Sequence, residues 1–328
     1  MNSFQVVATG LDFPEGGPIW LRDGSLLLVE IKAGTLIRIY PNGKKEIIAK
    51  LGGGPNSCAV GPNGHIYVTQ NGGFEWLSIG KNNSFLTVPT VQASDYKTGS
   101  IQVVELSSTL TTSRISTLFT EGIDTKGNTV KLKGPNDLVF DRSGGFWFTD
   151  HGKSRERERD ITGVFYVDSR GESCREVVFP LNSPNGIGLS PNGSRLYVAE
   201  TLTGRLFAYD VISPGKLKTA KGNLIYSAPE GYMFDSLAVD SEGNICVATL
   251  GRGSWGTGGI SVIKENGTGL RNFITTGDFF TTNICFGGID LQDAYITLSG
   301  TGKLVKMRWH CPGHRCNFEE LLHSESNL

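Results

Sequence analysis

Short apolar segments recur along the chain in pairs, and a turn that contains glycine separates the two members of each pair. The clearest copies cover residues 56–69, 136–149, 185–199 and 235–248. Each copy starts with a polar residue, continues with an apolar run and then turns at a glycine such as Gly64 or Gly193. Apolar runs of this length joined by turns predict β-hairpins, and no segment shows a sustained helical period of 3.6 residues. The sequence therefore predicts an all-β protein.

Two more copies begin at Glu15 and at Asn283, so the pattern occurs six times. Further β-type runs follow each hairpin, and repeats of roughly 40 to 50 residues with about four strands each are typical of propeller blades. We therefore expect a six-bladed β-propeller that forms a single domain over residues 1–328. The strand at 4–8 is expected to join the last blade and close the ring. An open β-solenoid or two stacked β-sandwiches are the competing architectures, but a sandwich does not explain an equivalent polar residue in every repeat.

Composition limits the partners of this fold. The 328 residues carry 31 Lys and Arg against 32 Asp and Glu, a net charge of −1, so we expect neither nucleic acid nor a membrane as a partner. The start of the chain lacks the basic and apolar regions of a signal peptide, and the six cysteines follow no disulfide spacing. These features predict a cytoplasmic protein.

The polar residue that opens each repeat is the candidate for chemistry. Because the first strand of every blade lines the central channel, the six equivalent residues should form a ring at one end of it. They are Glu15, Asn56, Asn136, Asn185, Asp235 and Asn283. Two facing carboxylates repel each other, and no Lys or Arg occupies a ring position to neutralise them. A divalent cation removes this repulsion, and all-oxygen ligands favour Ca²⁺ or Mg²⁺ over zinc.

A single Asn before a strand is often only a turn residue that binds its own backbone. Repetition at equivalent positions favours the metal interpretation for Glu15, Asn136, Asn185 and Asp235. For Asn56 and Asn283, we expect contacts with the substrate or contacts through water.

Four motifs, taken in order, resemble the senescence-marker-protein-30 (SMP-30)/gluconolactonase family, which also includes diisopropylfluorophosphatase-like enzymes. They are Phe-Pro-Glu-Gly at 13–16, Gly-Pro-Asn-Asp at 134–137, Ser-Pro-Asn-Gly at 183–186 and Phe-Asp-Ser-Leu-Ala-Val-Asp at 234–240. The resemblance spans essentially the whole chain. It implies a hydrolase with calcium ligands at Glu15, Asn136, Asn185 and Asp235, acting on lactones and in some members on organophosphates. Mg²⁺, Mn²⁺ or Zn²⁺ are alternative ions.

The chain departs from this family pattern at two places. The first motif of the family is commonly Glu-Gly-Pro, whereas an additional glycine follows Gly16 here. Sugar-lactone members often carry an arginine two residues before the Asn of the third blade, and that position is Gly134 in this chain. The loss of that cation weakens the case for a sugar-acid lactone and leaves the small-molecule substrate open.

If the substrate is a lactone, Asp235 is the candidate general base or nucleophile. His151, directly after a predicted strand, is a candidate proton shuttle or substrate contact, with a turn-capping histidine as the alternative. Among the aromatic residues near the predicted loops, Trp76 and Phe234 are the candidate substrate contacts, beside Phe74, Tyr232 and Trp255. Two segments, 76–98 and 152–160, are candidate lids. We expect the second to be a solvated loop because its Lys and Arg alternate with Glu.

Other functions fit the sequence less well. The chain lacks the WD-repeat signature of scaffold propellers and the Gly-x-Ser-x-Gly motif of serine hydrolases. The tail from His310 to Cys316 contains soft metal ligands, but their spacing matches no usual zinc pattern. We therefore predict a metal-dependent lactonase, with an organophosphate-hydrolysing phosphotriesterase or a non-catalytic binding propeller as alternatives.

Overall fold

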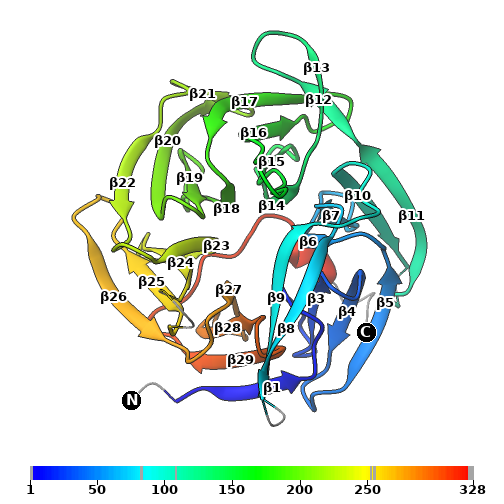
Figure 1. Ribbon diagram of the computed structural model, residues 1–328, viewed down its shortest axis with the longest axis vertical. Helices are drawn as coiled ribbons and strands as arrows, with labels where there is room; N and C mark the ends of the chain where they lie inside the picture. The colour runs from blue at the N-terminus through cyan, green and yellow to red at the C-terminus, as the bar shows by residue number, and fades with distance from the viewer. Residues whose placement is uncertain (1–2, 82–83, 108, 252, 254–255, 324–328) are drawn as a thin grey trace.

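The computed structural model describes residues 3–81, 84–107, 109–251, 253 and 256–323. Six mostly antiparallel sheets are arranged as blades around a central channel (Figure 1). The predicted all-β, six-bladed propeller is confirmed. We number the blades by the order of their innermost strands along the chain.

The first three blades are built from residues 19–181. Blade 1 contains β2 (Ile19–Trp20), β3 (Leu26–Glu30), β4 (Thr35–Ile39) and β5 (Lys45–Lys50). Blade 2 contains β6 (Pro55–Val60), β7 (Ile66–Gln70), β10 (Ser100–Leu106) and β11 (Thr112–Phe119). Blade 3 contains β14 (Pro135–Phe140), β15 (Phe146–Asp150), β16 (Thr162–Val167) and β17 (Cys174–Leu181), with β12 (Glu121–Ile123) and β13 (Thr129–Lys131) at its outer edge.

The other three blades complete the ring. Blade 4 contains β18 (Pro184–Leu189), β19 (Arg195–Glu200), β20 (Arg205–Ser213) and β22 (Asn223–Ser227), and β21 (Lys216–Leu217) also pairs with β20. Blade 5 contains β23 (Met233–Val239), β24 (Ile245–Leu250), β25 (Gly259–Ile263) and β26 (Leu270–Thr275). Blade 6 contains β27 (Thr281–Gly287), β28 (Asp293–Leu298), β29 (Lys303–Arg308) and β1 (Gln5–Thr9).

Ring closure depends on the N-terminal strand. β1 is the outermost strand of blade 6 and runs antiparallel to β29, with Gln5 opposite Lys306 and Thr9 opposite Lys303. The prediction that this segment joins the last blade is therefore confirmed. The pairing covers the edge of β29, which would otherwise present free backbone groups to other chains.

The turns between the first and second strands of the blades follow from local chemistry. Gly64 and Gly193 adopt positive φ angles of 74° and 72°, which side chains with a Cβ atom rarely adopt. The carboxamide of Asn63 accepts a hydrogen bond from the backbone amide of His65, two residues later. Asn and Gly in this arrangement fix a tight turn and hence the register of the hairpin.

The hydrophobic core is divided among the blade interfaces. Six clusters of buried apolar side chains each join two neighbouring blades, and one of them packs Trp147 and Val164 of blade 3 against Ile187 and Leu196 of blade 4. All six cysteines are free thiols, and Cys58 and Cys246 are buried within these clusters, as the apolar sequence around them predicts. No helix in the described part of the chain is long and apolar enough to cross a bilayer.

Two segments outside the blades cover the ends of the channel. The insertion after β7 forms the hairpin of β8 (Phe74–Lys81) and β9 (Ser84–Gln92), which crosses blade 1 (Figure 1) and reaches blade 6, where the Thr87 amide donates to the Gly300 carbonyl. The C-terminal segment runs across the middle of the ring to the short 3₁₀ helix η1 (Glu319–His323). His314 and Asn317 on it donate to carbonyls of Val239 and Phe140, which end the inner strands of blades 5 and 3. The tail therefore covers one end of the channel, and the hairpin borders the other.

Candidate functional site

The inner strands of blades 2 to 5 carry the candidate ligands close to their first residues, and a β-bulge marks this point in blades 2 to 6. The ladder with the second strand shifts register there, between Pro55 and Ser57, Pro135 and Leu138, Pro184 and Ile187, Phe234 and Leu237, and Thr281 and Asn283. A bulge bends its strand and re-aims a side chain. The re-aimed residues line one cavity of about 170 Å³ together with Glu15, and they are Asn56, Asn136, Asn185, Asp235 and Thr282.

Glu15 reaches the same cavity from the segment before β2. Its backbone amide donates to the Val29 carbonyl, and Pro14 forms a β-bridge with Glu30, so this segment occupies the place of a bulged strand start. The additional glycine of the first motif has a steric reason. Gly17 has a φ of 63°, and a Cβ atom there would lie 2.0 Å from the Cys58 carbonyl oxygen. The glycine therefore lets the loop pack against β6 while Glu15 still faces the cavity.

Blade 6 departs from the sequence-based alignment by one residue. Thr282 is the bulged residue that lines the cavity, whereas Asn283 lies one position further along β27 and lines a separate space deeper in the channel, beside Ser57 and Asp137. A shift of one residue moves a strand side chain to the opposite face. Asn283 is therefore not among the residues that surround this cavity.

The asparagine side chains are oriented by hydrogen bonds to their nitrogen atoms. Nδ2 of Asn185 donates to Oγ1 of Thr201 at 3.1 Å, and Nδ2 of Asn136 donates to Oδ1 of Asn56 at 3.4 Å. The amide oxygens consequently face the cavity. Oδ1 of Asn136, Oδ1 of Asn185 and Oε2 of Glu15 are buried and have no hydrogen-bond donor. Three buried acceptors at one place lack the partners that buried polar groups nearly always have.

The two carboxylates interact strongly. Burial, followed by the repulsion from Asp235, raises the pKa of Glu15 well above its ordinary value, and burial raises the pKa of Asp235 to about 8. A third acid, Asp137, lies in the next layer of the channel, where burial raises its pKa to about 6. It accepts a hydrogen bond from the Ser57 hydroxyl at 2.8 Å. Without a cation, one of the two cavity carboxylates must therefore hold a proton near neutral pH.

A hard divalent cation would both bind the acceptor oxygens that lack donors and neutralise the two carboxylates that repel each other. Carboxylate and amide oxygens are the ligands that Ca²⁺ and Mg²⁺ prefer. The predicted ligands Glu15, Asn136, Asn185 and Asp235 all line the cavity, and their donor atoms fit such an ion. Asn56 also lines it, but its Oδ1 accepts hydrogen bonds from Asn71 and Asn136, which leaves it an orienting role.

His151 lines the cavity from the end of β15, as its position after the strand suggests. Its Nε2 lies 3.0 Å from Nη2 of Arg159. Burial, together with the charges of Arg159 and Lys153, lowers the pKa of His151 to about 3, so the imidazole is neutral. A guanidinium group can only donate, so Nε2 is the acceptor and the imidazole proton is on Nδ1. This engaged lone pair disfavours a proton shuttle and leaves His151 a positioning or substrate-contact role.

The loop at 152–160 differs from the expected solvated loop. Only its tip, residues 156–158, is exposed. Lys153 is buried, with Nζ donating to the Gly73 carbonyl and lying 3.9 Å from the centre of the Phe74 ring. Arg159 lines the cavity. The alternation of Lys and Arg with Glu concealed the fact that both ends of the loop turn inward.

Apolar side chains form the rest of the wall. Phe13, Phe74 and Phe280 line the cavity. Trp76 is not a lining residue and packs on Phe13 with ring centroids 5.0 Å apart. Phe234, the other predicted substrate contact, is fully buried in the core between blades 4 and 5. Trp255 lies outside the described residues, and Tyr232 packs edge-on against Phe273.

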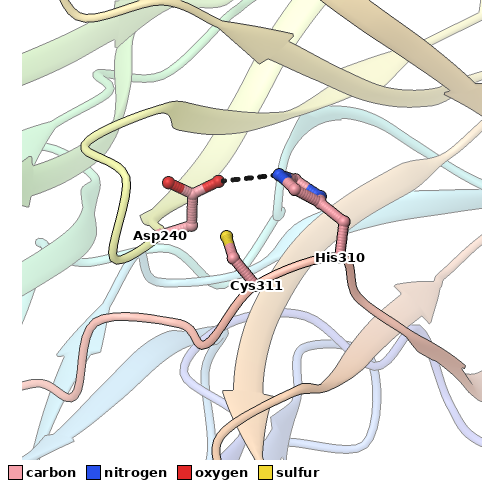
Figure 2. Close-up of side chains that lie close together, drawn as sticks. All are labelled: Asp240, His310 and Cys311. Carbon is pink, nitrogen blue, oxygen red and sulfur yellow. Dashed lines mark ion pairs between the residues drawn. The ribbon is translucent and has the colours of Figure 1, made fainter.

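A second group of ligand-type side chains lies at the opposite end of β23. Asp240, His310 and Cys311 place one ligand atom each within 4.8 Å of one another (Figure 2). However, the Asp240 carboxylate accepts hydrogen bonds from the backbone amides of Glu242 and Asn244 and from the side chains of Asn244 and Trp309. Burial raises the pKa of the Cys311 thiol, which disfavours the thiolate that zinc requires. The geometry therefore gives no support to a zinc site in the tail.

Comparison with known proteins adds family information. The model of the SMP-30/Gluconolactonase/LRE-like region matches residues 13–300. The lactonase drp35 of Staphylococcus saprophyticus is 28% identical over 263 residues, which cover 78% of this chain and 68% of that protein. A gluconolactonase of Zymomonas mobilis is 25% identical over an alignment of 334 residues, covering 93% of this chain and 80% of that protein. These relatives are hydrolases, which confirms the expectation of an ester-cleaving enzyme at that level.

Among solved structures, regucalcin from Agrobacterium tumefaciens, described as a calcium-binding protein, has a similar fold. The TM-score is 0.64 with 16% sequence identity, and the match covers 96% of this chain and 98% of that one. At this identity the similarity supports the fold alone.

Proposed function

Because the chain belongs to the SMP-30/gluconolactonase/LRE-like family, we propose that it is a metal-dependent lactonase whose active site is the cavity around Glu15 and Asp235. One observation carries this proposal above the others. Three buried acceptor oxygens without donors, on Glu15, Asn136 and Asn185, surround the same space as two repelling carboxylates. That arrangement is costly in a scaffold protein and useful in a metallohydrolase.

The proposed ion is calcium, held by Glu15, Asn136, Asn185 and Asp235. Two carboxylates balance its charge, and neutral amide oxygens complete an all-oxygen set of the kind that Ca²⁺ accepts. The calcium-binding description of regucalcin, which has the same fold, supports this choice. When bound, the ion would act as a Lewis acid towards the lactone carbonyl oxygen, where negative charge develops during ring opening.

The remaining roles belong to residues of the chain. Asp235 is the proposed general base, which takes a proton from the attacking water, or the nucleophile itself; its Oδ1 is oriented by the amide of Ser236 at 3.0 Å. The phenyl rings of Phe13, Phe74 and Phe280 exclude water from one side of the cavity. An apolar wall beside a polar floor suits a cyclic ester, which has a hydrocarbon ring and one reactive carbonyl.

The test is hydrolysis of a lactone panel and of one phosphotriester, before and after chelation and with Ca²⁺, Mg²⁺, Mn²⁺ or Zn²⁺ added back. We expect lactone hydrolysis that is lost on chelation and restored by Ca²⁺. Asp235→Asn should reduce this rate by roughly 10²- to 10⁴-fold, the usual contribution of a general base. Full activity in the chelated protein would overturn the metal dependence, and preferential cleavage of the phosphotriester would favour the phosphotriesterase alternative.

A further inference from the structure

Arg159 contributes a positive charge to the cavity, and neither of the side chains that bind it carries a negative charge. Its Nη1 donates to the Ser154 hydroxyl and its Nη2 to the neutral His151 imidazole. Its Nε is buried and has no hydrogen-bond acceptor. Both partners are uncharged, so the guanidinium is partly removed from water without gaining an anion in return.

The nearby acids have other partners. The Asp160 carboxylate is bound by Arg155 through two hydrogen bonds of 2.7 and 3.2 Å, and one of its oxygens also accepts from the Lys153 amide at 3.0 Å. Glu15 and Asp235 carry the proposed metal. Among the residues that the structure describes, none forms an ion pair with Arg159. Burial lowers the pKa of Arg159, and the charge of Asp160 offsets this only in part. The place of its counterion is therefore left to a ligand of the cavity.

Charge balance determines how many negative charges that ligand should carry. In the loaded site, two carboxylates cancel a divalent ion, and His151 is neutral, so the described residues that line the cavity leave one positive charge, that of Arg159. A carboxylate supplies one negative charge and matches the planar guanidinium with two oxygens. A phosphate monoester would bring about two negative charges, and a neutral phosphotriester or unsubstituted lactone would bring none.

Building on the proposed lactonase function, we infer that Arg159 selects lactones that carry a free carboxylate in addition to the ring carbonyl. The guanidinium binds the substituent carboxylate while the ring carbonyl faces Asp235. Ser154 and His151 act as positioning residues because they hold Nη1 and Nη2 and thereby aim the guanidinium into the cavity. The cation that Gly134 does not provide is thus supplied by a different loop.

The kinetic test uses calcium-loaded protein and two lactones of nearly equal size, γ-carboxy-γ-butyrolactone and the corresponding carboxamide. We expect wild type to prefer the carboxylate. Arg159→Met should lower kcat/KM for the carboxylate by roughly 10- to 100-fold, mainly through KM. The same variant should change kcat/KM for the carboxamide by less than about threefold, because only the charged contact is lost. Arg159→Lys should restore part of the preference, since it keeps the charge and loses the planar fork.

Arg157→Met is the matched control, since Arg157 is at the exposed tip of the same loop and should leave both rates unchanged. An equal loss for both lactones in Arg159→Met would overturn the inference, since the residue would then act on the reacting carbonyl. Equal use of the two lactones by wild type would overturn it as well.

A binding measurement separates this inference from the proposed function. Calorimetry of the calcium-loaded protein compares α-hydroxyglutarate, the ring-opened acid, with its α-monoamide. We expect wild type to bind the diacid at least about 10-fold more tightly and Arg159→Met to lose that difference. If wild type shows this preference yet hydrolyses neither lactone, the lactonase function fails and the carboxylate site stands. If it hydrolyses lactones without the preference, the lactonase function stands and the carboxylate site fails.

Discussion

The two ends of strand β23 carry an aspartate each, and they differ in almost every respect that matters for metal binding. Asp235 lies at the start, in the bulge, and Asp240 follows the last residue of the strand. Both are buried, and both lie near other ligand-type side chains. Asp235 faces acceptors without donors and a second carboxylate, whereas Asp240 is surrounded by donors.

This contrast shows that the type of ligand atom at a site matters less than whether those atoms already have hydrogen-bond partners. The group of Asp240, His310 and Cys311 has the softer and more varied set of atoms, yet protein donors already satisfy its carboxylate. The predicted ligands in the cavity offer only oxygens, and three of these, on Glu15, Asn136 and Asn185, have no hydrogen-bond donor. A metal is expected where the chain leaves acceptors unpaired, because there a cation replaces an energetic cost with a bond.

Among the variants that compare metal demand at the two ends of the channel, the largest effect is expected from Glu15→Gln, which keeps the shape of the side chain and removes one of the two charges that would balance the ion. Calcium affinity should fall by at least about tenfold, as for loss of a metal-site group, and lactone hydrolysis by roughly 10²- to 10³-fold. Calorimetric titration with Ca²⁺ and initial rates measure the two effects. Asp240→Asn, at the other end of β23, is the control and should retain calcium affinity; equal losses in both variants would erase the distinction between the two ends.

The next effect concerns stability at the Asp240 end. Asp240→Ala should lower the free energy of unfolding by about 3 kcal/mol, because it leaves the Asn244 and Trp309 donors buried without an acceptor. Urea denaturation of the calcium-loaded protein measures it. Asp290→Ala is the matched control, since Asp290 accepts from the Gln292 amide in an equivalent but exposed turn, where it also pairs with Arg308, and its loss should lower the free energy of unfolding far less. An activity loss in Asp240→Ala as large as in Glu15→Gln would contradict our assignment of roles.

A third effect is the pH dependence of the metal-free protein. Because the pKa of Asp235 is about 8 in the folded state, above that of an unfolded aspartate, the folded state holds more protons between about pH 4 and 8. The stability difference between wild type and Asp235→Asn in chelator should therefore fall as the pH rises through this window, by on the order of 2 kcal/mol between pH 6 and 8. The comparison cancels the opposite contributions of His151 and Lys153, whose pKa values burial lowers to about 3 and about 7. Urea denaturation of both proteins at the two pH values tests this, and a difference that rises with pH would refute the raised pKa of Asp235.

The smallest effect is expected from Cys311→Ser. Because Cys311 is not expected to hold an ion, the stoichiometry and affinity of Zn²⁺ and Ca²⁺ should not change, and the free energy of unfolding should change by less than about 1 kcal/mol. Competition with a chromogenic zinc chelator provides the measurement. Loss of one tightly bound zinc ion in this variant would show that the tail is a metal site after all.

Much of the architecture could be predicted because the repeat is a local pattern. Turn glycines, apolar runs and one polar residue in each repeat were sufficient for the six blades, the channel and the cavity positions of Glu15, Asn136, Asn185 and Asp235. The error at Asn283 has a simple cause. A β-bulge adds one residue without any change in composition, so a polar residue next to Thr282 was taken for its equivalent.

Other features depended on long-range packing that no local pattern records. Arg159 and Lys153 were expected in solvent because their loop alternates charges, but Arg159 turns inward towards His151 and Lys153 towards the distant Phe74. Phe234, which directly precedes Asp235, was expected near substrate because it is an aromatic residue near a predicted loop. Successive residues of a strand point to opposite faces, so the neighbour of a site residue is often a core residue.

The pairing of β1 with β29 means that the last blade can be completed only late in synthesis. β1 has to remain unpaired until about 300 further residues, from Thr9 to Lys303, have been synthesised. The entropic cost of closing so long a loop grows only slowly with its length. Contacts between such remote segments nevertheless make folding slow, and they leave the edge of β29 in a nascent chain exposed and prone to aggregation for longer. Deletion of either β1 or β29 would therefore leave the ring open, with an unpaired strand edge.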